Sequence, residues 1–388
     1  MIVAGEASGD LHGSRLIGSM LHRNPALHFC GIGGPEFKKC GVELLYDASK
    51  IAVVGFFEVI SHLSHIIKAQ RALRQRLAEK PPQLLILIDF PDFNLLLAKR
   101  ARKLGVPIFY YISPQVWAWR SGRIKKIDQL TDAIGVILPF EEAYYRERGV
   151  SKAHYVGHPL LDTVASSMSR KEFCAANDID PHRKLIGLLP GSRSREINSL
   201  LPEFLRAAER LNEISPEPPL FLIPQAPTID ADELLGAGLA ECDSRLDARI
   251  IGDDRYELMA ACDAVVAASG TVTLEILLLD TPMVVAYKIS PMTYRIARLL
   301  VHLGQFSLAN LGFFSLVNLV AGKEVVLELL QDEANAETIS AELYRLVFDQ
   351  NHRRTQMSEF KSVREKLGDR GASTRAAALA LSLMEKDD

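Results

Sequence analysis

Residues 264–275 read Ala-Val-Val-Ala-Ala-Ser-Gly-Thr-Val-Thr-Leu-Glu, and this stretch decides the fold class of the chain. The apolar run 264–268 predicts a strand buried on both faces, and residues 271–279 predict a helix. Ser269 is expected to cap that helix, because its hydroxyl can accept a hydrogen bond from a free first-turn amide. Gly270 lets a ligand approach the backbone without a Cβ in the way. The stretch therefore predicts a strand, a turn and a helix, the repeating unit of α/β proteins.

The same stretch carries groups that suit a nucleotide. The first turn of the helix, at Thr271, offers N–H donors and the positive end of the helix dipole to a phosphate. Glu275 follows four residues later on the same helix face, where its acceptor oxygens suit the two hydroxyls of a ribose. The alternative is an ordinary capped helix with Glu275 as a solvated surface acid.

Apolar runs alternate with helical patterns along most of the chain, which predicts parallel sheets with helices on both faces. In the first half the expected strands are 1–5 (very short), 84–88, 107–112, 133–138 and 154–156, with helices at 66–79 and 95–104. In the second half they are 185–189, 220–223, 248–251, 264–268 and 283–286. We expect an α/β protein with two doubly wound, Rossmann-like domains that face each other across a cleft. The expected domains are 1–165 and 166–334, followed by a helical tail, 335–388, that packs back on the first domain or is exchanged in a dimer.

The composition excludes several classes of protein. A net charge of −3 argues against general nucleic-acid binding, which needs a basic face. Five scattered cysteines with no CxxC pair argue against a disulfide framework or a cysteine zinc site. The sequence contains no run of 18 apolar residues, so no transmembrane helix is predicted, and no export signal is recognisable. We expect an intracellular protein, soluble or peripheral on a membrane.

A second glycine turn follows the strand expected at 185–189. Gly191 and Ser192 can donate backbone hydrogen bonds to phosphate oxygens, and Arg193 can neutralise a diphosphate. The turn lacks the Lys-Ser/Thr ending of a P-loop and the spacing of a dinucleotide fingerprint. It is either a polar turn with a surface arginine or, with residues 264–275, the donor site for a nucleotide-diphosphate sugar.

Two further groups lie where parallel strands end, the edge at which such folds bind ligands. Asp89 leaves the apolar strand 84–88, so partial desolvation could raise its pKa and make it a general base toward a sugar hydroxyl. The alternative is that Asp89 or Asp92 caps the next helix. The first strand is followed by a turn that is either ordinary or in contact with an acceptor, and its candidate residues are Glu6, Ser8, Gly9 and Asp10.

The segment 51–63 is more apolar than a surface connection should be. It is either a mobile lid that receives acyl chains or enters a membrane, or a buried core helix. Basic residues could face anionic head groups or lie on solvated helix faces; they are Arg71, Arg74, Arg76, Arg120, Arg123, Lys125 and Lys126. His62 and His65 have helical spacing but no acidic partner motif, so a metal site is not expected. Trp117 and Trp119 either line the cleft or pack beside it.

Taken together, five motifs resemble the lipid-A-disaccharide synthase family. They are Val-Ala-Gly-Glu-Ala-Ser-Gly-Asp (3–10), Ile-Asp-Phe-Pro-Asp-Phe-Asn (88–94), Tyr-Ile-Ser-Pro-Gln-Val-Trp-Ala-Trp-Arg (111–120), Leu-Pro-Gly-Ser-Arg (189–193) and Ala-Ser-Gly-Thr-Val-Thr-Leu-Glu (268–275). The resemblance runs in this order from residue 3 to about residue 330. It implies an inverting glycosyltransferase of the two-domain GT-B architecture. The implied reaction joins UDP-2,3-diacylglucosamine to 2,3-diacylglucosamine 1-phosphate (lipid X), which gives a β-1,6 disaccharide phosphate and UDP.

The resemblance also implies roles for individual residues. Asp89 corresponds to the essential aspartate of the cleft, Arg193 to the essential arginine, and Glu275 to an acid of the donor site. An asparagine that precedes a Leu-Ala-Gly-(Lys/Arg)-Glu run in the family corresponds either to Asn318 or to Asn310, and Asn318 is an expected contact of the UDP-sugar. A hydrophobic segment associated with acyl chains or the membrane corresponds to Val53, Val54, Phe56, Phe57, Val59, Ile60 and Leu63.

The implied enzyme needs no metal or other cofactor and is peripheral on the cytoplasmic face of the inner membrane, and a homodimer is expected. The first strand is shorter than in the family. We expect Arg193, Ser269, Gly270 and Thr271 on the diphosphate, Glu275 on the ribose and Asp89 as the base. Two alternatives stay open: a UDP-N-acetylglucosamine 2-epimerase on the same fold, and a non-catalytic lipid-binding protein at the membrane surface.

Overall fold

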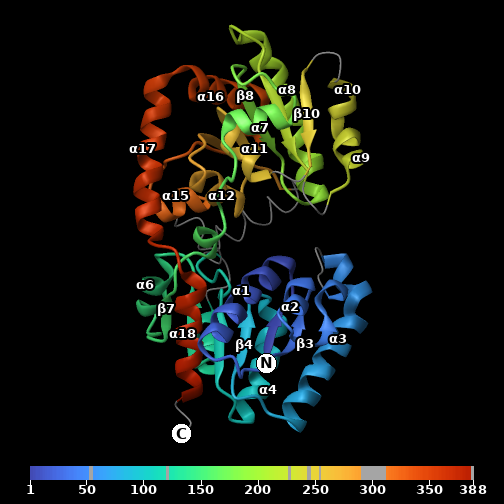
Figure 1. Cartoon of the computed structure of the whole chain (residues 1–388), viewed down its shortest axis with the longest axis vertical. Coiled ribbons are helices and arrows are strands. Elements are labelled where there is room, and N and C mark those ends of the chain that lie inside the picture. Colours follow the sequence, from blue (N-terminus) through green and yellow to red (C-terminus); the bar gives the residue numbers. More distant parts are fainter. Residues whose placement is uncertain are drawn as a thin grey trace. The chain divides into compact units, whose positions relative to one another are not determined.

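The chain forms two compact units in the computed structural model (Figure 1). One contains Met1–Asp162 together with Asp369–Asp388, and the other contains Thr163–Gly368. The structure describes residues 1–51, 56–118, 122–225, 229–242, 246–252, 255–289 and 312–385, with the backbone alone at 56–62.

The first unit is built on a parallel sheet whose seven described strands have the order β3-β2-β1-β4-β5-β6-β7. The strands are β1 (Ile2–Ala4), β2 (Cys30–Gly33), β3 (Glu43–Asp47), β4 (Leu85–Ile88), β5 (Ile108–Tyr111), β6 (Ala133–Val136) and β7 (Ala153–Tyr155). The central strands are apolar on both faces, as a sheet covered on two sides requires. In the register of β4 and β5, Ile88 lies beside Tyr111, so the residues that follow both strands are neighbours.

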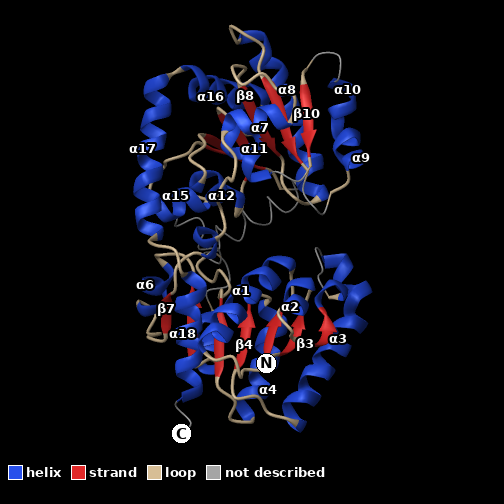
Figure 2. Ribbon diagram, viewed as in Figure 1, coloured by secondary structure: helices blue, strands red, loops and turns tan. Residues whose placement is uncertain are grey.

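Helices cover both faces of this sheet (Figure 2). On one face the core contains residues of α1 (Ala7–Arg23), α2 (Pro35–Lys39) and α18 (Ala372–Met384). On the other it contains residues of α3 (Phe56–Glu79), α4 (Pro91–Lys103) and α5 (Arg123–Leu130). Shorter elements complete the unit: η1 (Ala48–Lys50), α6 (Glu141–Arg146) and η2 (Pro159–Asp162).

The second unit is also a parallel α/β unit, and its six described strands have the order β10-β9-β8-β11-β12-β13. The strands are β8 (Leu185–Leu189), β9 (Leu220–Pro224), β10 (Ala248–Ile251), β11 (Ala264–Ala268), β12 (Met283–Tyr287) and β13 (Glu328–Leu330). Its helices are α7 (Arg170–Ala176), α8 (Ser194–Ile214), α9 (Ala231–Leu234), η3 (Leu235–Leu239), α10 (Ala240–Cys242), α11 (Arg255–Ala261), α12 (Val272–Leu278), α15 (Leu316–Ala321), η4 (Gln331–Glu333), α16 (Ala336–Phe348) and α17 (Gln350–Leu367).

The expected fold class is confirmed, since each unit is a doubly wound parallel sheet. The strands expected at 185–189, 248–251 and 264–268 have these bounds, and the others shift by one or two residues. Strands β2, β3 and β13 were not expected. Helices α3 and α4 begin ten and four residues earlier than the periodicity of the sequence indicates.

The carboxyl-terminal helices divide between the two units, whereas we expected one tail from residue 335. Helices α16 and α17 belong to the second unit, where α16 packs along α8. Helix α18 belongs to the first unit and packs along α1 (Figure 1). Its contact face consists of small residues, Ala376, Ala377 and Ala380, which are fully buried and allow the close approach of the helices.

Candidate functional site

Asp89 lies in a strained turn at the carboxyl end of β4. Asp89 and Phe90 both have left-handed backbone conformations, with φ of 43° and 46°. Non-glycine residues adopt this region at a cost of about 1–3 kcal/mol each, and such strain concentrates at functional sites. Phe90 is the N-cap residue of α4, and no side chain caps that helix. The alternative prediction, that Asp89 or Asp92 is a helix cap, is therefore wrong.

Neighbouring residues hold this turn in place. The Tyr110 hydroxyl donates a 2.7 Å hydrogen bond to the backbone oxygen of Asp89. Asn94 Nδ2 donates to the same oxygen at 2.7 Å and to the oxygen of Ile88 at 3.1 Å. Gly5 makes room for the turn, because a Cβ there would meet the ring of Phe90 at 2.5 Å. These contacts fix the backbone of Asp89.

The surroundings of Asp89 favour proton uptake. Burial, together with the negative charge of Glu6, raises its pKa to about 6. A carboxylate with this pKa is ionised at neutral pH yet basic enough to accept a proton from a hydroxyl group. Asp89 therefore has the properties of a general base.

Of the four candidate residues after β1, Glu6 is the N-cap residue of α1 and Ser8, Gly9 and Asp10 lie in the first turn of that helix. Glu6 and Ser8 are exposed. Gly9 packs closely on the sheet, since a Cβ there would lie 3.3 Å from Ala4 Cβ. Asp10 is buried, and its carboxylate accepts hydrogen bonds from three backbone N–H groups, those of Gly34 (2.7 Å), Glu36 (2.9 Å) and Phe37 (3.2 Å). These bonds fix the start of α2, so we revise the expected acceptor contact of Asp10 to a structural role.

In the second unit, Glu196 contacts the turn after β8, a role that sequence reasoning missed. Gly191 has φ of 114°, and a Cβ there would meet Glu196 Oε2 at 2.3 Å. The Ser192 N–H donates to Glu196 Oε2 at 3.2 Å, and the Arg193 guanidinium lies 3.4 Å from Glu196 Oε1. Arg193 remains exposed, with 58% of its side chain accessible. Its spacing from Glu196, three residues into a helix, is the signal that could have revealed this pair.

Ser269 is not the cap that the sequence predicts. Its hydroxyl donates a 3.1 Å hydrogen bond to the backbone oxygen of Phe314, and no side chain caps α12. The helix begins one residue later than expected, with Thr271 as its N-cap residue. Gly270 has open space where a Cβ would lie, and both Gly270 and Thr271 are exposed. The turn is open to a ligand although Ser269 faces the protein.

Glu275 is a buried, paired acid. It is 7% exposed and accepts hydrogen bonds from Arg255 Nη2 and from the Tyr256 hydroxyl, each at 3.1 Å. Burial raises its pKa against the opposing effects of Arg255 and Tyr256. The alternative of a solvated surface acid is therefore wrong, while a contact with ribose stays a prediction.

Asn318 is fully buried, and its side chain is saturated within the protein. Its Nδ2 donates to the Val326 oxygen at 2.8 Å and to Glu328 Oε1 at 2.9 Å. Its Oδ1 accepts from the N–H groups of Val325 (2.7 Å) and Val326 (3.0 Å). An amide side chain forms about four hydrogen bonds, so these contacts account for its usual number. These bonds give the Asn318 side chain a structural role, its contact with the nucleotide stays a prediction, and Asn310 lies outside the described residues.

Comparison with known proteins decides the family. The model of the lipid-A-disaccharide synthetase family matches residues 1–382. The lipid-A-disaccharide synthases of Geobacter metallireducens and Syntrophus aciditrophicus are each 46% identical to this chain, which they cover completely, with 97% and 98% of their own lengths aligned. The chain belongs to the lipid-A-disaccharide synthase family. It is a glycosyltransferase.

Solved structures related to this synthase share its fold at low sequence identity. A UDP-N-acetylglucosamine 2-epimerase described as putative, from Listeria monocytogenes, aligns with a TM-score of 0.66 and 10% identity over 100% of this chain and 97% of its own. MurG of Acinetobacter baumannii aligns with a TM-score of 0.58 and 13% identity over 98% of both chains. At these identities the likeness shows the GT-B architecture alone.

The apolar segment of the synthase is described only in part. Val53 and Val54 lie outside the described residues, and Phe56, Phe57, Val59 and Ile60 lie in α3 with the backbone alone described. Leu63 and Ile67 are exposed by 49% and 58%. Arg71 and Arg74 continue the same helix face and are also exposed. Farther along α3, Leu73 and Leu77 are buried, so that part of the helix, which lies beyond segment 51–63, packs in the core.

Other residues singled out in the sequence have structural partners. His65 Nδ1 is hydrogen-bonded to the Tyr46 hydroxyl at 2.6 Å. Trp117 is buried and donates to Glu141 Oε1 at 2.9 Å, whereas Trp119 lies outside the described residues. In the part of the chain that the structure describes, no group of three His, Cys, Asp or Glu side chains could hold a metal ion. None of the helices described there has the length and apolar character needed to cross a bilayer.

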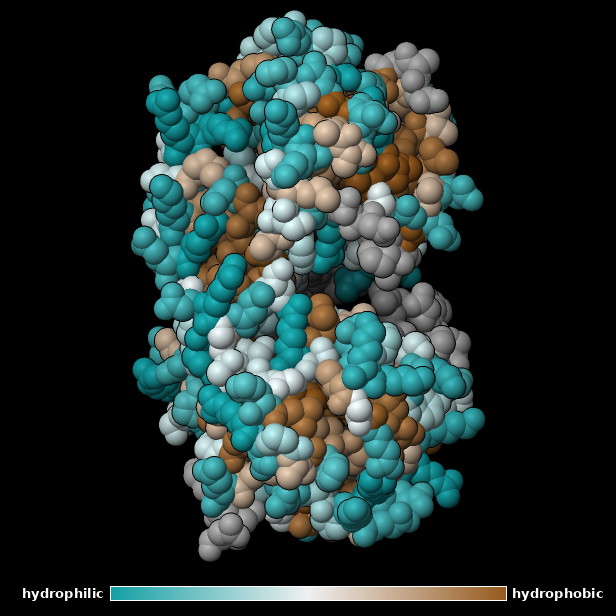
Figure 3. Space-filling view, in the orientation of Figure 1, coloured by the Kyte–Doolittle hydropathy of each residue, from teal (hydrophilic) through white to brown (hydrophobic). Residues whose placement is uncertain are grey.

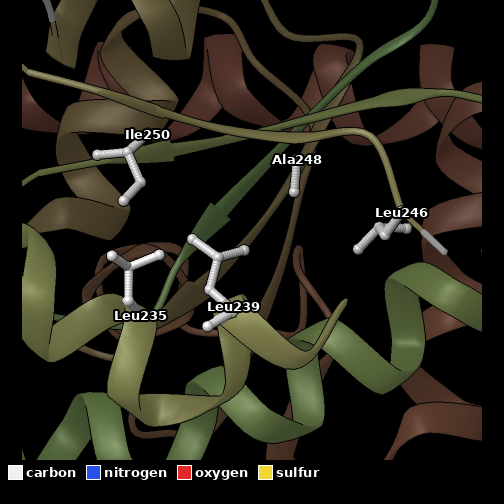
Figure 4. A pocket seen from close by; sticks show the side chains of 6 residues that line it. Leu235, Leu239, Leu246, Ala248 and Ile250 are labelled. Atoms are coloured by element: carbon white, nitrogen blue, oxygen red, sulfur yellow. The ribbon is translucent and has the colours of Figure 1, made fainter. Parts of the chain in front are cut away.

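An aliphatic pocket of about 310 Å³ lies at the edge strand of the second unit (Figure 4). It is lined by Leu235, Leu239, Ala240, Leu246, Ala248 and Ile250, from β10 and the helical segment beside it. Figure 3 shows hydrophobic side chains at the surface of this region. All of its lining side chains are apolar, so none of them would orient a sugar or a phosphate.

Proposed function

We propose that this enzyme transfers 2,3-diacylglucosamine from UDP-2,3-diacylglucosamine to the 6-hydroxyl of 2,3-diacylglucosamine 1-phosphate, giving the β-1,6 disaccharide 1-phosphate and UDP. The observation that carries the mechanism is the strained turn that presents Asp89, with its pKa raised to about 6. The membership of the chain in the synthase family supplies the substrates.

The second unit holds the UDP-sugar in this proposal. Backbone groups of the turns at Gly191 and Gly270 face the diphosphate, and the exposed guanidinium of Arg193 neutralises it. Glu275 receives the ribose hydroxyls, with Arg255 and Tyr256 holding its carboxylate in position. Ser269 holds the turn through Phe314 rather than contacting the ligand.

The first unit holds the acceptor, and Asp89 acts on it. Asp89 takes the proton of the 6-hydroxyl while that oxygen forms a bond with the anomeric carbon of the donor. The bond from the anomeric carbon to the diphosphate breaks at the same time, and its electrons leave with UDP. Attack from the face opposite the leaving group inverts the configuration. Arg193 stabilises the charge that grows on UDP, so the proposal needs no metal ion.

We also propose a peripheral contact with the membrane through α3. Leu63 and Ile67 would enter the headgroup boundary, while Arg71 and Arg74 on the same face would bind anionic lipid. The homodimer expected from the family resemblance stays a prediction, which sedimentation of the purified enzyme tests.

The test is to incubate the purified protein with both lipid precursors and to measure UDP and disaccharide mass together. We expect Asp89→Asn to reduce turnover by about 10²- to 10⁴-fold, as loss of a general base does, while the affinity for UDP stays constant. Asp92→Asn is the matched control: Asp92 is the second residue of α4, is exposed, and pairs with Arg123 at 2.5 Å. Near-normal turnover of Asp89→Asn would refute the base assignment, and consumption of the donor alone would favour an epimerase.

A further inference from the structure

The carboxylate of Glu196 lies on two groups that the turn after β8 offers to a diphosphate. Its Oε2 accepts the N–H of Ser192 at 3.2 Å, and its Oε1 lies 3.4 Å from the Arg193 guanidinium. Both groups belong to the proposed donor site, where each would have a phosphate oxygen as its partner. A carboxylate of the protein itself therefore occupies donors that the ligand needs.

The side chain of Glu196 folds back over this turn instead of extending into solvent. A Cβ at Gly191 would lie 2.3 Å from Glu196 Oε2 and 2.9 Å from Glu196 Cβ, so the carboxylate packs on the backbone of that glycine. The side chain of Glu196 is 25% accessible, whereas that of Arg193 is 58% accessible. A residue with a Cβ at position 191 would therefore push the carboxylate off the turn.

The start of α8 suits an anion for reasons that do not depend on Glu196 itself. Arg193 is the N-cap residue of this 21-residue helix, and no side chain caps it by accepting a hydrogen bond from its first turn. The first-turn N–H groups and the positive end of the helix dipole favour negative charge there, and the guanidinium adds to them. Carboxylate and phosphate oxygens accept from the same donors, so Glu196 and a diphosphate compete for them.

Glu196 is held loosely compared with an acid in a similar place in the first unit. Glu141, which follows β6, is 2% exposed. Its carboxylate accepts from the N–H groups of Ile137 (3.0 Å) and Leu138 (2.8 Å) and from Trp117 Nε1 (2.9 Å). The two side-chain contacts of Glu196 are longer, and an ion pair as exposed as the one it forms contributes little to stability. A diphosphate, which carries more charge than a carboxylate, is therefore able to displace it.

We propose that Glu196 is an internal competitor for the diphosphate site: the UDP-sugar displaces its carboxylate, and the carboxylate returns as UDP leaves. This inference rests on the proposed function, because that function places a diphosphate on the turn and on Arg193. Rotation of the Glu196 side chain suffices for the exchange, and no covalent bond changes. The effect is to lower the affinity for UDP and to speed the release of this product, a step that limits turnover in many enzymes.

The competing explanation is structural, in which Glu196 only stabilises the start of α8. A glutamate three residues after the N-cap residue often reaches back to a free N–H group in this way. Removing its charge would then change the free energy of unfolding and leave the affinity for UDP constant. Ligands with and without a diphosphate separate the two explanations.

The experiment compares the dissociation constants of UDP, measured by calorimetry, and of uridine, measured by ligand-observed NMR, for the wild type and Glu196→Gln. Removal of the competing charge is expected to lower Kd for UDP about 2- to 10-fold. Kd for uridine, which has no phosphate, should stay constant. Glu213→Gln is the matched control, because it removes the same charge from an exposed position of α8, about 25 Å farther along the helix axis. It should leave both constants unchanged.

A second variant keeps the proposal falsifiable if Glu196→Gln unfolds more easily. Glu196→Asp keeps a negative charge near the start of α8, but its side chain is one methylene shorter, so Kd for UDP should fall by a smaller factor. In stopped-flow displacement, the rate constant for UDP release should decrease in both Glu196 variants and stay constant in Glu213→Gln.

The outcomes distinguish the inference from the function on which it rests. An unchanged or higher Kd for UDP in both Glu196 variants would assign this residue to helix capping or to donor binding, and would overturn the inference. An equal change in Kd for uridine would overturn it as well. Failure of the wild type to bind UDP would instead refute the proposed donor site.

Discussion

The hydroxyl of Tyr110 donates a 2.7 Å hydrogen bond to the backbone oxygen of Asp89, the residue with φ of 43° at the end of β4. Tyr110 is fully buried on the neighbouring strand, so it ties the strained turn to the core of the sheet. Asn94 supplies a second bond to the same oxygen. The position of the proposed base thus depends on side chains that do not touch the substrate.

Replacing Tyr110 by Phe is expected to reduce kcat about 10- to 100-fold, because a small displacement of a catalytic group has effects of that size. The free energy of unfolding should fall by only about 1 kcal/mol, the value of one hydrogen bond. Tyr145→Phe is the control, since its buried hydroxyl donates to Ser113 at 3.3 Å. Equal kcat values for the two variants would show that Tyr110 does not position Asp89.

Glu6→Gln should change the pH dependence of the reaction. Burial and Glu6 together raise the pKa of Asp89 to about 6, so activity should fall as the pH drops through that value. Removing the charge of Glu6 favours ionised Asp89, which should shift the acid limb of kcat/KM to lower pH by roughly half a unit to one unit. The profile is measured from pH 4.5 to 8, with Ser8→Ala as the control. A shift to higher pH would contradict the assignment.

Substituting alanine for the glycine of each turn in the second unit should change the free energy of unfolding by different amounts. Gly191→Ala forces a Cβ against Glu196 at φ of 114°, so we expect a loss of about 1–3 kcal/mol in the free energy of unfolding. Gly270 has open space around it, so Gly270→Ala should unfold like the wild type. If the turn faces the diphosphate, Gly270→Ala will still raise KM for the UDP-sugar. Denaturant titration and donor kinetics on both variants separate the two effects.

Asn318→Ala tests the structural role of Asn318. The substitution leaves the N–H groups of Val325 and Val326 without their acceptor, so a loss of about 2–4 kcal/mol is expected. The enzyme that remains folded should keep its KM for the UDP-sugar. Wild-type stability combined with loss of donor binding would restore Asn318 to the nucleotide site.

His158 should make the protein less stable in acid. Its pKa in the folded protein is about 3, below the ordinary value of 6.5, so the unfolded chain binds more protons between these values. The free energy of unfolding therefore falls as the pH decreases from 6.5 toward 3, by at most about 1.4 kcal/mol per pH unit from this group. His158→Asn, which can still accept from Leu160, should reduce that slope, whereas exposed His28→Asn should not.

The sequence predicts most accurately the strands whose bounds follow from a local run of apolar residues. Strands β8 and β11 are uniformly apolar, so their bounds follow from composition. Strand β2 contains two glycines in four residues, and β3 is only partly buried, so neither has a clear strand pattern. Asp89 was identifiable because it follows an apolar strand directly.

The site residues whose contacts the sequence did not predict have distant partners. Ser269 has the composition of a cap, but its hydroxyl bonds to Phe314, 45 residues later in the chain. Asn318 fits the family motif, but its bonds to residues 325–328 become visible only in the fold.

The division of the carboxyl-terminal helices has a consequence for biosynthesis. Helix α18 completes the first unit, yet the ribosome translates it after the whole second unit. Until then the core that α1, the sheet and α18 share lacks the alanines of α18 in the nascent chain. A messenger truncated after codon 368 would therefore yield a product that holds every donor-binding residue but exposes this core to chaperones and proteases.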